Sequence, residues 1–401
     1  MPFQAMTRGW TDEARRAARI AAAGLVAGIL AACSGGPNIP GLSNLGASPT
    51  PQAEAPPPVP GGLRVGVILP VSAAGNVGAA GVAMRNAAEM AAAEFNNPKV
   101  QLLVKDDGGT PDGARAAAQQ ALAEGVDVIV GPLIAPSVQA VGQVARGAGK
   151  PVIAFSTDSS VAGPGVYLLS FLPETEVDRI VEYASSRGKK SIAALVPNTA
   201  YGNVVAAAFQ ESAARRGVRV AAMERYTTND RAALAASAQR IAAMGDLVDA
   251  LFLPENGDGM AAAAGAIAAA GLDGRKVQLL GTSAWDDPRV TSIKTVQGGW
   301  YAAPDRAGYG GFASRYRAKF GGDPVRSASL AYDAVFLVEA LFAKSGVAGL
   351  SEATLTNPDG VIGTDGLFRF RPDGVNQRGL AVYQAGGGVL SPAPRAFAAG
   401  T

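Results

Sequence analysis

The sequence contains no histidine and only one cysteine, Cys33, among its 401 residues. The missing histidine removes the commonest general base, the commonest zinc ligand and every Ser-His or Cys-His nucleophile. A single cysteine cannot form a disulfide within the chain, so the fold must rest on its own apolar core. We therefore expect a protein that is not an enzyme and that holds no metal.

Aromatic residues are also scarce, at 6% of a chain that is 48% hydrophobic. Alanine, glycine and valine make up the difference, and such small residues suit helices that pack closely on a parallel sheet. After Cys33 there is no apolar run of 18 residues, so we expect no membrane span there.

Neither sign of charge dominates, because 35 Lys and Arg residues face 33 Asp and Glu residues. The basic residues are scattered along the chain rather than gathered in runs. A protein that binds nucleic acid needs a basic field to neutralise phosphates. We therefore expect no nucleic-acid partner.

The N-terminal stretch has the layout of an export signal. Four arginines lie between residues 8 and 19, and the uncharged segment Ile20–Ala32 follows them. Thirteen uncharged residues are typical of a signal peptide and too few to span a bilayer. We predict a signal peptide over residues 1–32.

The end of this signal, Leu30-Ala-Ala-Cys33, resembles the bacterial lipobox. The resemblance implies that Cys33 becomes the lipidated N-terminus and anchors the protein to an envelope membrane from the periplasm. Ser34 stands where an Asp usually retains Gram-negative lipoproteins at the inner membrane, which favours the outer membrane. The alternative is an ordinary signal peptide with an unrelated cysteine.

Residues 34–62 contain eight prolines among Gly, Ser, Asn and Ala. Such a composition buries too little apolar surface to fold, and the prolines stiffen it. We predict that residues 33–62 are the lipidated cysteine and its linker, and that the folded part begins at Leu63.

Short apolar runs alternate with helical stretches from Leu63 onward, in two successive blocks. The first block has expected strands at 63–69, 100–105, 127–131 and 151–155, with helices at 77–95, 112–124 and 137–149. The second has expected strands at 191–196, 218–223, 249–253 and 277–281, with helices at 174–187, 201–216, 231–244 and 258–270. This alternation predicts βαβ units and two α/β lobes with parallel sheets.

Several short motifs occur in this order: Gly66-Val-Ile-Leu-Pro70, Val130-Gly-Pro-Leu133, Asn198-Thr-Ala-Tyr-Gly202, Ala331-Tyr-Asp-Ala334 and Ile362-Gly-Thr-Asp-Gly-Leu-Phe-Arg-Phe370. With them, residues 63 to about 390 resemble the type 1 periplasmic binding proteins of the leucine/isoleucine/valine-binding family. The resemblance implies two doubly wound parallel-sheet lobes, a ligand cleft and three interlobe crossovers, near Leu172, Ala303 and Ile362. Lobe 1 would comprise residues 63–172 and 303–362, and lobe 2 residues 173–302 and 363–401.

The resemblance also implies a ligand site at the carboxyl ends of the strands. In the family, hydroxyl and backbone groups at Ser137, Ser156 and Thr157 would hold the carboxylate and ammonium of an amino acid, and Tyr201 would close over it from lobe 2. An alternative role for Ser137 is helix capping.

The sequence departs from the family pattern at other positions of this site. Asp158 stands where the amino-acid binders have a small hydroxyl residue, and its carboxylate would repel a ligand carboxylate. Ser283 and its neighbours replace the expected carboxylate of lobe 2, for which Glu255 is a substitute. The resemblance therefore supports the family's fold more strongly than the family's amino-acid pocket.

The glycine-rich loop at residues 72–81 follows a strand and opens a helix, as a phosphate-binding loop does. It lacks the dinucleotide-binding pattern, so we expect it to form a cleft wall and predict no cofactor.

Two functions remain open. The first is capture of a small polar or amino-acid-like ligand for an ABC permease, by hinged closure of the lobes. The second follows from Trp285-Asp-Asp-Pro288 and Gly298-Gly-Trp-Tyr301, which look similar to the lipoproteins known as penicillin-binding protein activators. That resemblance implies contact with a peptidoglycan synthase. The Asp286-Asp287 pair favours a capped helix start over a metal or acid–base site.

Overall fold

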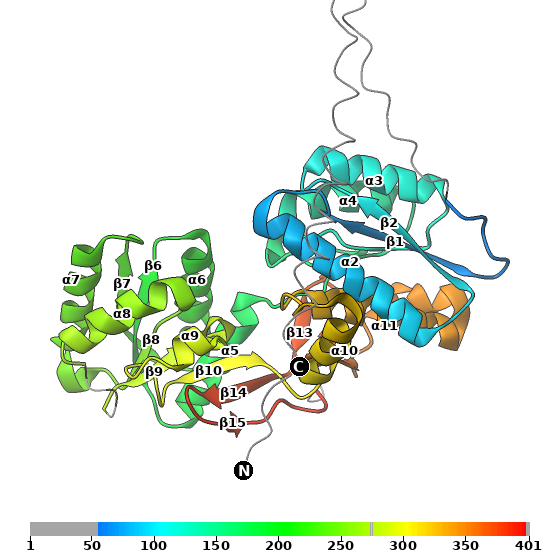
Figure 1. Cartoon of the computed structure of the whole chain (residues 1–401). Helices are drawn as coiled ribbons and strands as arrows, with labels where there is room; N and C mark the ends of the chain where they lie inside the picture. The colour runs from blue at the N-terminus through cyan, green and yellow to red at the C-terminus, as the bar shows by residue number, and fades with distance from the viewer. Residues whose placement is uncertain (1–54, 273, 275, 398–401) are drawn as a thin grey trace, which may run out of the picture. The chain divides into compact units, whose positions relative to one another are not determined.

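The computed structural model describes residues 55–272, 274 and 276–397 (Figure 1). The predicted signal peptide and the lipidation site Cys33 lie outside the described residues. The compact folded unit begins at Ala55.

The first sheet has five parallel strands in the order β2-β1-β3-β4-β5. Its elements are β1 (Leu63–Leu69), α2 (Gly75–Phe95), β2 (Val100–Asp106), α3 (Pro111–Ala123), β3 (Val128–Val130), α4 (Ala135–Gly147), β4 (Val152–Ala154) and β5 (Val166–Leu168). Strand β1 lies inside this sheet and is buried along its whole length, since helices cover both faces. Leu63, Val65 and Val67 pack toward α2, whereas Ile68 packs toward α3 and α4.

The second sheet has seven strands in the order β15-β14-β10-β9-β8-β6-β7. Its elements are α5 (Pro173–Ser186), β6 (Ser191–Pro197), α6 (Ala200–Arg215), β7 (Arg219–Tyr226), α7 (Arg231–Ala242), β8 (Ala250–Phe252), α8 (Gly257–Ala269), β9 (Gln278–Gly281), α9 (Pro288–Thr291), β10 (Trp300–Pro304), β14 (Leu380–Gln384) and β15 (Val389–Ser391). Strands β7, β6, β8, β9 and β10 are parallel, while β14 and β15 add antiparallel strands at one edge.

Between β10 and β14 the chain returns to the first sheet. This segment contains α10 (Tyr309–Phe320), α11 (Ala328–Ser345), α12 (Glu352–Leu355), β11 (Val361–Gly363), β12 (Gly366–Phe370) and β13 (Asn376–Arg378). Helix α11 packs beside α2 (Figure 1). Phe368 and Phe370 of β12 belong to the same core cluster as Val65 and Val67 of β1. This packing favours a last crossover after Arg378 rather than near Ile362, and the division into lobes otherwise stays a prediction.

The first and last connections between the sheets are fastened to each other. The Ser170 carbonyl, which follows β5, accepts hydrogen bonds from Asn376 Nδ2 at 2.8 Å and from Arg378 Nε at 3.0 Å. Ser170 Oγ donates in turn to the Phe155 carbonyl at 3.0 Å. These buried hydrogen bonds hold the two connections together beside the first sheet.

The described end of the proline-rich segment contacts the folded unit. Arg64, which is 8% exposed, donates to the Pro56 and Glu124 carbonyls, and Gln101 Nε2 donates to the Pro57 carbonyl at 2.9 Å. Residues 55–60 therefore pack against the starts of β1 and β2, upstream of the predicted start at Leu63.

The predicted fold class is confirmed: parallel sheets alternate with helices in two α/β blocks. The antiparallel strands β11–β15 extend that prediction, because the C-terminal segment completes both blocks. Within the described residues, none of the helices combines the length and the apolar character that crossing a bilayer requires.

Candidate functional site

Four of the proposed ligand-binding residues lie at the carboxyl edge of the first sheet. Ser156 and Thr157 follow β4, and Asp158 caps the short 3-10 turn Ser159–Val161 by accepting from Ser160 N at 3.0 Å. Ser156 is 4% exposed and its Oγ accepts from Asp158 N at 3.1 Å, while Thr157 and Asp158 are exposed. The Asp158 carboxylate, which we expected to repel a ligand carboxylate, therefore accepts a hydrogen bond from this turn.

Ser137 lies in the first turn of α4, but it does not cap that helix. The N-cap is Ile134, which makes no side-chain cap, since α4 begins at Ala135 with a proline in its first turn. Ser137 is fully buried, and its Oγ has no hydrogen-bond partner among the described residues. The capping role considered from the sequence is thus wrong.

The other three proposed residues lie at the carboxyl edge of the second sheet. Tyr201 starts α6 after β6, Glu255 follows β8, and Ser283 follows β9. Tyr201 Oη lies 2.7 Å from the Thr282 hydroxyl, beside Ser283. Parallel strands end at one edge, and the structure brings these three residues together there.

Glu255 is almost fully enclosed at this edge, at 6% exposed. The Tyr226 hydroxyl donates to its Oε1, and Asn256 N donates to its Oε2 at 3.2 Å. Burial raises the pKa of Glu255 despite these hydrogen bonds. Burial and the bond to Glu255 together raise the pKa of Tyr226, which keeps that hydroxyl a donor.

Sequence reasoning missed a second buried carboxylate, Glu176, in the first turn of α5. It is 4% exposed and accepts from Ser283 N at 3.0 Å. Burial raises its pKa to about 7. The signal was available, because Glu176 is four residues before Ile180 and so shares the buried face of the helix.

A pocket of about 600 Å³ opens at this edge between the ends of β6, β7 and β8. Tyr201, Tyr226, Glu255 and Asn256 line it, with Thr199 and the Thr227–Arg231 segment. We call it the lobe 2 pocket. Its volume lies within the range of small-molecule sites in proteins.

The chemistry of the lobe 2 pocket is that of a cation or hydroxyl acceptor. Glu255 offers a buried carboxylate and Tyr201 and Tyr226 offer hydroxyl groups, on a wall that also carries the polar Thr227–Arg231 segment. A ligand ammonium placed there would favour the charged form of Glu255 that burial disfavours. Within the described residues, no group of three or more Asp, Glu, His or Cys side chains could hold a metal ion.

One residue of the tryptophan motifs, Trp285, fills the core beside this edge. Trp285 is fully buried, and its Nε1 donates to the Leu253 carbonyl at 3.0 Å. Its indole lies where a Cβ at Gly281 would stand, so the glycine makes room for it. Asp287 caps α9 by accepting from Arg289 N at 2.7 Å, which confirms the capped helix start.

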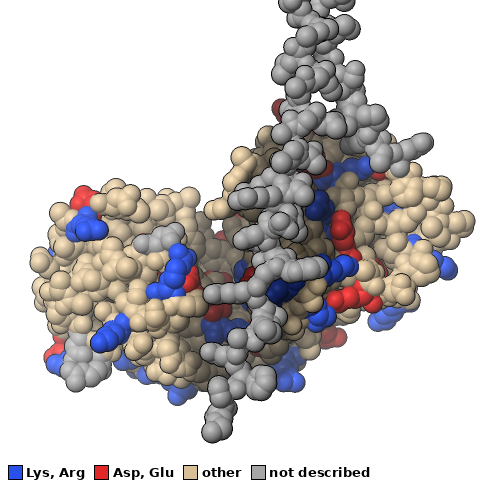
Figure 2. Space-filling view, in the orientation of Figure 1, with Lys and Arg blue, Asp and Glu red and all other residues tan. Residues whose placement is uncertain are grey.

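Figure 2 shows lysine and arginine side chains interspersed with Asp and Glu side chains on the visible face of the molecule. The surface charges thus have mixed signs, as the sequence composition indicates. The candidate site is distinguished by buried carboxylates rather than by a strong surface field.

Comparison with known proteins agrees with this architecture. Residues 62–389 match the family model described as periplasmic binding protein. None of the curated protein sequences matches the chain significantly.

Solved structures of similar fold come from several bacteria. A candidate branched-chain amino acid ABC transporter from Rhodospirillum rubrum shares 22% identity at a TM-score of 0.70, over 81% of this chain and 97% of that one. A Desulfitobacterium hafniense ABC transporter substrate-binding protein in complex with Leu shares 19% at 0.61, over 82% and 99%. A Rhodopseudomonas palustris solute-binding protein in complex with 3,4-dihydroxybenzoic acid shares 21% at 0.59, over 84% and 98%.

At these identities the solved structures establish the fold, whereas the family match spans most of the chain and establishes kinship. The chain therefore belongs to the periplasmic binding protein family, and this membership places it in the periplasm.

Proposed function

We propose that the protein is a solute-binding lipoprotein, which captures a small amino-acid-like ligand between its lobes and delivers it to an ABC permease. The observation that supports this proposal most strongly is the burial of the Glu255 carboxylate at the wall of the lobe 2 pocket. A buried carboxylate is costly without a cationic partner, and a ligand ammonium would supply one.

The first sheet would supply the groups that hold the ligand carboxylate. Ser156 and Thr157 offer hydroxyls after β4, and α4 points its N-terminus toward the same edge, where partial positive charge favours an anion. The buried Ser137 hydroxyl lies in that first helical turn. Tyr201 and Ser283 would contact the ligand from the second sheet.

Among the solved structures of this fold, one holds Leu and another holds 3,4-dihydroxybenzoic acid. Glu255 and Glu176 favour the amino-acid class for this protein, because an aromatic acid carries no cation to pair with them. Both classes carry the carboxylate that the first sheet would hold.

Calorimetric titration of the purified protein with single amino acids tests the proposal. We expect micromolar binding of at least one amino acid, and a loss of about tenfold or more in Glu255→Gln, because a charge-assisted hydrogen bond is removed. Glu89→Gln is the matched control, since Glu89 is exposed on α2. Identical binding heat in the wild type and in Glu255→Gln would show that Glu255 is not part of the site. Absence of binding heat with every amino acid would contradict the proposal that the ligand is an amino acid.

The anchor is a separate part of the proposal. Lipidation of Cys33 would hold the protein at an envelope membrane, and Ser34 after the cysteine favours the outer membrane over the inner one. Fractionation of cells that express Cys33→Ala should find the protein in the soluble periplasmic fraction. Retention of the variant in the membrane fraction would contradict the anchor.

The second candidate is an activator that contacts a peptidoglycan synthase. In the tryptophan motif behind it, Trp285 is buried in the core, whereas Asp286 and Pro288 are exposed. Recovery of a synthase with the purified protein, together with no amino-acid heat, is the result that would favour this function.

A further inference from the structure

A second pocket, of about 1020 Å³, shares no residue with the lobe 2 pocket. It opens on the outer faces of α5 and α6, against β13 and residues 392–397. We call it the arginine pocket, because Arg179, Arg215, Arg216 and Arg371 stand in its wall. On α5, Asp178 and Arg179 face this pocket, whereas Val177 and Ile180 face the core.

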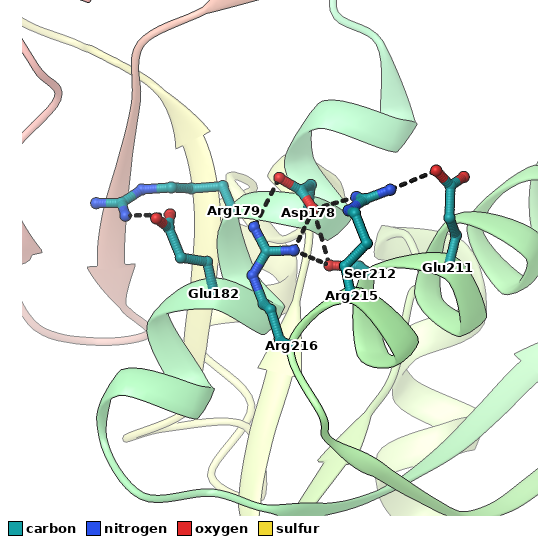
Figure 3. A network of polar contacts seen from close by, with 7 residues as sticks. All are labelled: Asp178, Arg179, Glu182, Glu211, Ser212, Arg215 and Arg216. Carbon is teal, nitrogen blue, oxygen red and sulfur yellow. Dashed lines mark hydrogen bonds and ion pairs between the residues drawn. The ribbon is translucent and has the colours of Figure 1, made fainter. Parts of the chain in front are cut away.

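Figure 3 shows how Asp178 holds two of these arginines in place. Its Oδ1 accepts from Arg215 at 2.5 Å and from Arg216 at 2.6 Å, and its Oδ2 accepts from Arg216 at 2.9 Å. Ser212 Oγ adds a third donor to Oδ1 at 2.9 Å. Two guanidinium groups thus share one aspartate, and Arg215 also pairs with Glu211.

Two of the three partners of Arg179 are not carboxylates. Its Nε donates to the Leu380 carbonyl at 3.1 Å, and its Nη2 donates to Ser391 Oγ at 2.7 Å. These partners lie on β14 and β15, so the second sheet itself positions this guanidinium. Its remaining bond is to Glu182 Oε2 at 2.8 Å.

The carboxylates that complete the network are the exposed ones. The Glu182 side chain is 53% exposed beside Arg179, and the Glu211 side chain is 73% exposed beside Arg215. Exposed ion pairs of this kind contribute only about 0–1 kcal/mol. An incoming anion can therefore replace Glu182 and Glu211 while Asp178 and the β14–β15 edge keep the arginines in position.

Asn376 and Arg378 also line the pocket but are almost fully buried, at 1% and 6% exposed. The Arg378 guanidinium lies over the rings of Phe171 and Phe368, and both residues donate to the Ser170 carbonyl, so the protein itself engages these two side chains. The same wall offers apolar surface from Leu172 and Phe397.

We propose that the arginine pocket binds a small organic anion with several carboxylates, as a second ligand site that is independent of the lobe 2 pocket. Preorganised guanidinium groups recognise carboxylates through paired hydrogen bonds, and the volume admits a molecule larger than a single amino acid. The wall combines α5 and α6 with β13, so an occupant contacts elements of both sheets.

Citrate is the probe, titrated calorimetrically into the purified protein at constant ionic strength, with acetate as the monocarboxylate control. We expect citrate to bind and acetate to give no saturable heat. Arg215→Gln should weaken citrate binding about tenfold, the loss of one charge-assisted hydrogen bond. Glu211→Gln should strengthen it several-fold, because the competing carboxylate is gone.

Arg240→Gln is the matched control, because Arg240 pairs with Glu224 outside the pocket. Its citrate affinity should equal that of the wild type. A thermal melt of each variant checks that it is folded. When Arg215 is replaced, Asp178 retains its ion pair with Arg216. Absence of saturable citrate heat in the wild type, or equal affinities in Arg215→Gln and Glu211→Gln, would overturn the proposal.

Discussion

At the scale of single residues, the space around Glu255 is set by a glycine one helical turn later. A Cβ at Gly259 would overlap the Glu255 carboxylate. The glycine therefore leaves room for the carboxylate to lie between Tyr226 and the start of α8. The size of the side chain at position 259 should therefore control how well Glu255 can bind a ligand.

Gly259→Ala should weaken amino-acid binding about tenfold, because the new methyl group displaces the Glu255 carboxylate from its position. Gly265→Ala lies on the same helix, with nothing within 4 Å of its added Cβ. That control should bind normally and gain about 0.5–1 kcal/mol of stability, as alanine does over glycine inside a helix. Calorimetry and urea unfolding of the two variants check this, and equal binding by both would contradict the steric argument.

Sequence reasoning reached some of these residues and not others. Tyr201 and Glu255 each follow a recognisable strand, so their meeting at one sheet edge could be foreseen. Glu176 could have been found from its helical spacing, but an acidic first turn also has an ordinary role next to the helix dipole. Ser137 was given an alternative role as a cap, because a proline in the first turn of α4 conceals where the helix begins.

At the scale of elements, α11 carries a charge deep inside the first block. Glu339 is fully buried, and neither carboxylate oxygen has a hydrogen-bond partner among the described residues. Burial raises the pKa of Glu339 to about 7. Its pKa is higher folded than unfolded, so its contribution to stability is complete below the unfolded pKa of about 4.5 and is lost as pH rises toward 7.

Glu339→Gln should therefore change the pH dependence of stability in a defined window. Relative to the variant, the wild type should lose up to about 3 kcal/mol of unfolding free energy between pH 4.5 and pH 7, and nothing further above that. Urea unfolding at a series of pH values measures the difference, with Glu89→Gln as the exposed control. A constant difference between Glu339→Gln and wild type across this window would contradict the buried ionisation.

The long elements were predictable, and the short ones depended on tertiary pairing. Strands β1, β2 and β6 fall where uninterrupted apolar runs predict them. Strand β5 has three residues and was not predicted, because its order comes from pairing with β4. Strands β11 and β13 are equally short and become ordered by pairing with β12.

At the scale of the whole molecule, the described chain enters at the edge opposite the candidate ligand site. Pro56 is held by Arg64 near the start of β1, whereas Ser156 and Thr157 follow the carboxyl end of β4. A seven-residue strand such as β1 separates these edges by about 23 Å.

The two sheets each contribute one edge to the proposed ligand site. The first and last connections between the sheets meet at Ser170. Capture of a ligand between the lobes requires that these edges approach each other about such connections. The buried bonds from Asn376 and Arg378 to Ser170 provide a fixed point for that motion. Hinged closure on an amino acid is thus the central claim of this account.

Small-angle X-ray scattering of the purified protein, with and without saturating amino acids, tests that claim most directly. Closure on a ligand should give a smaller radius of gyration when amino acids are present in the wild type, and no such change in Glu255→Gln. A radius of gyration that stays the same in the wild type with every amino acid would contradict the account.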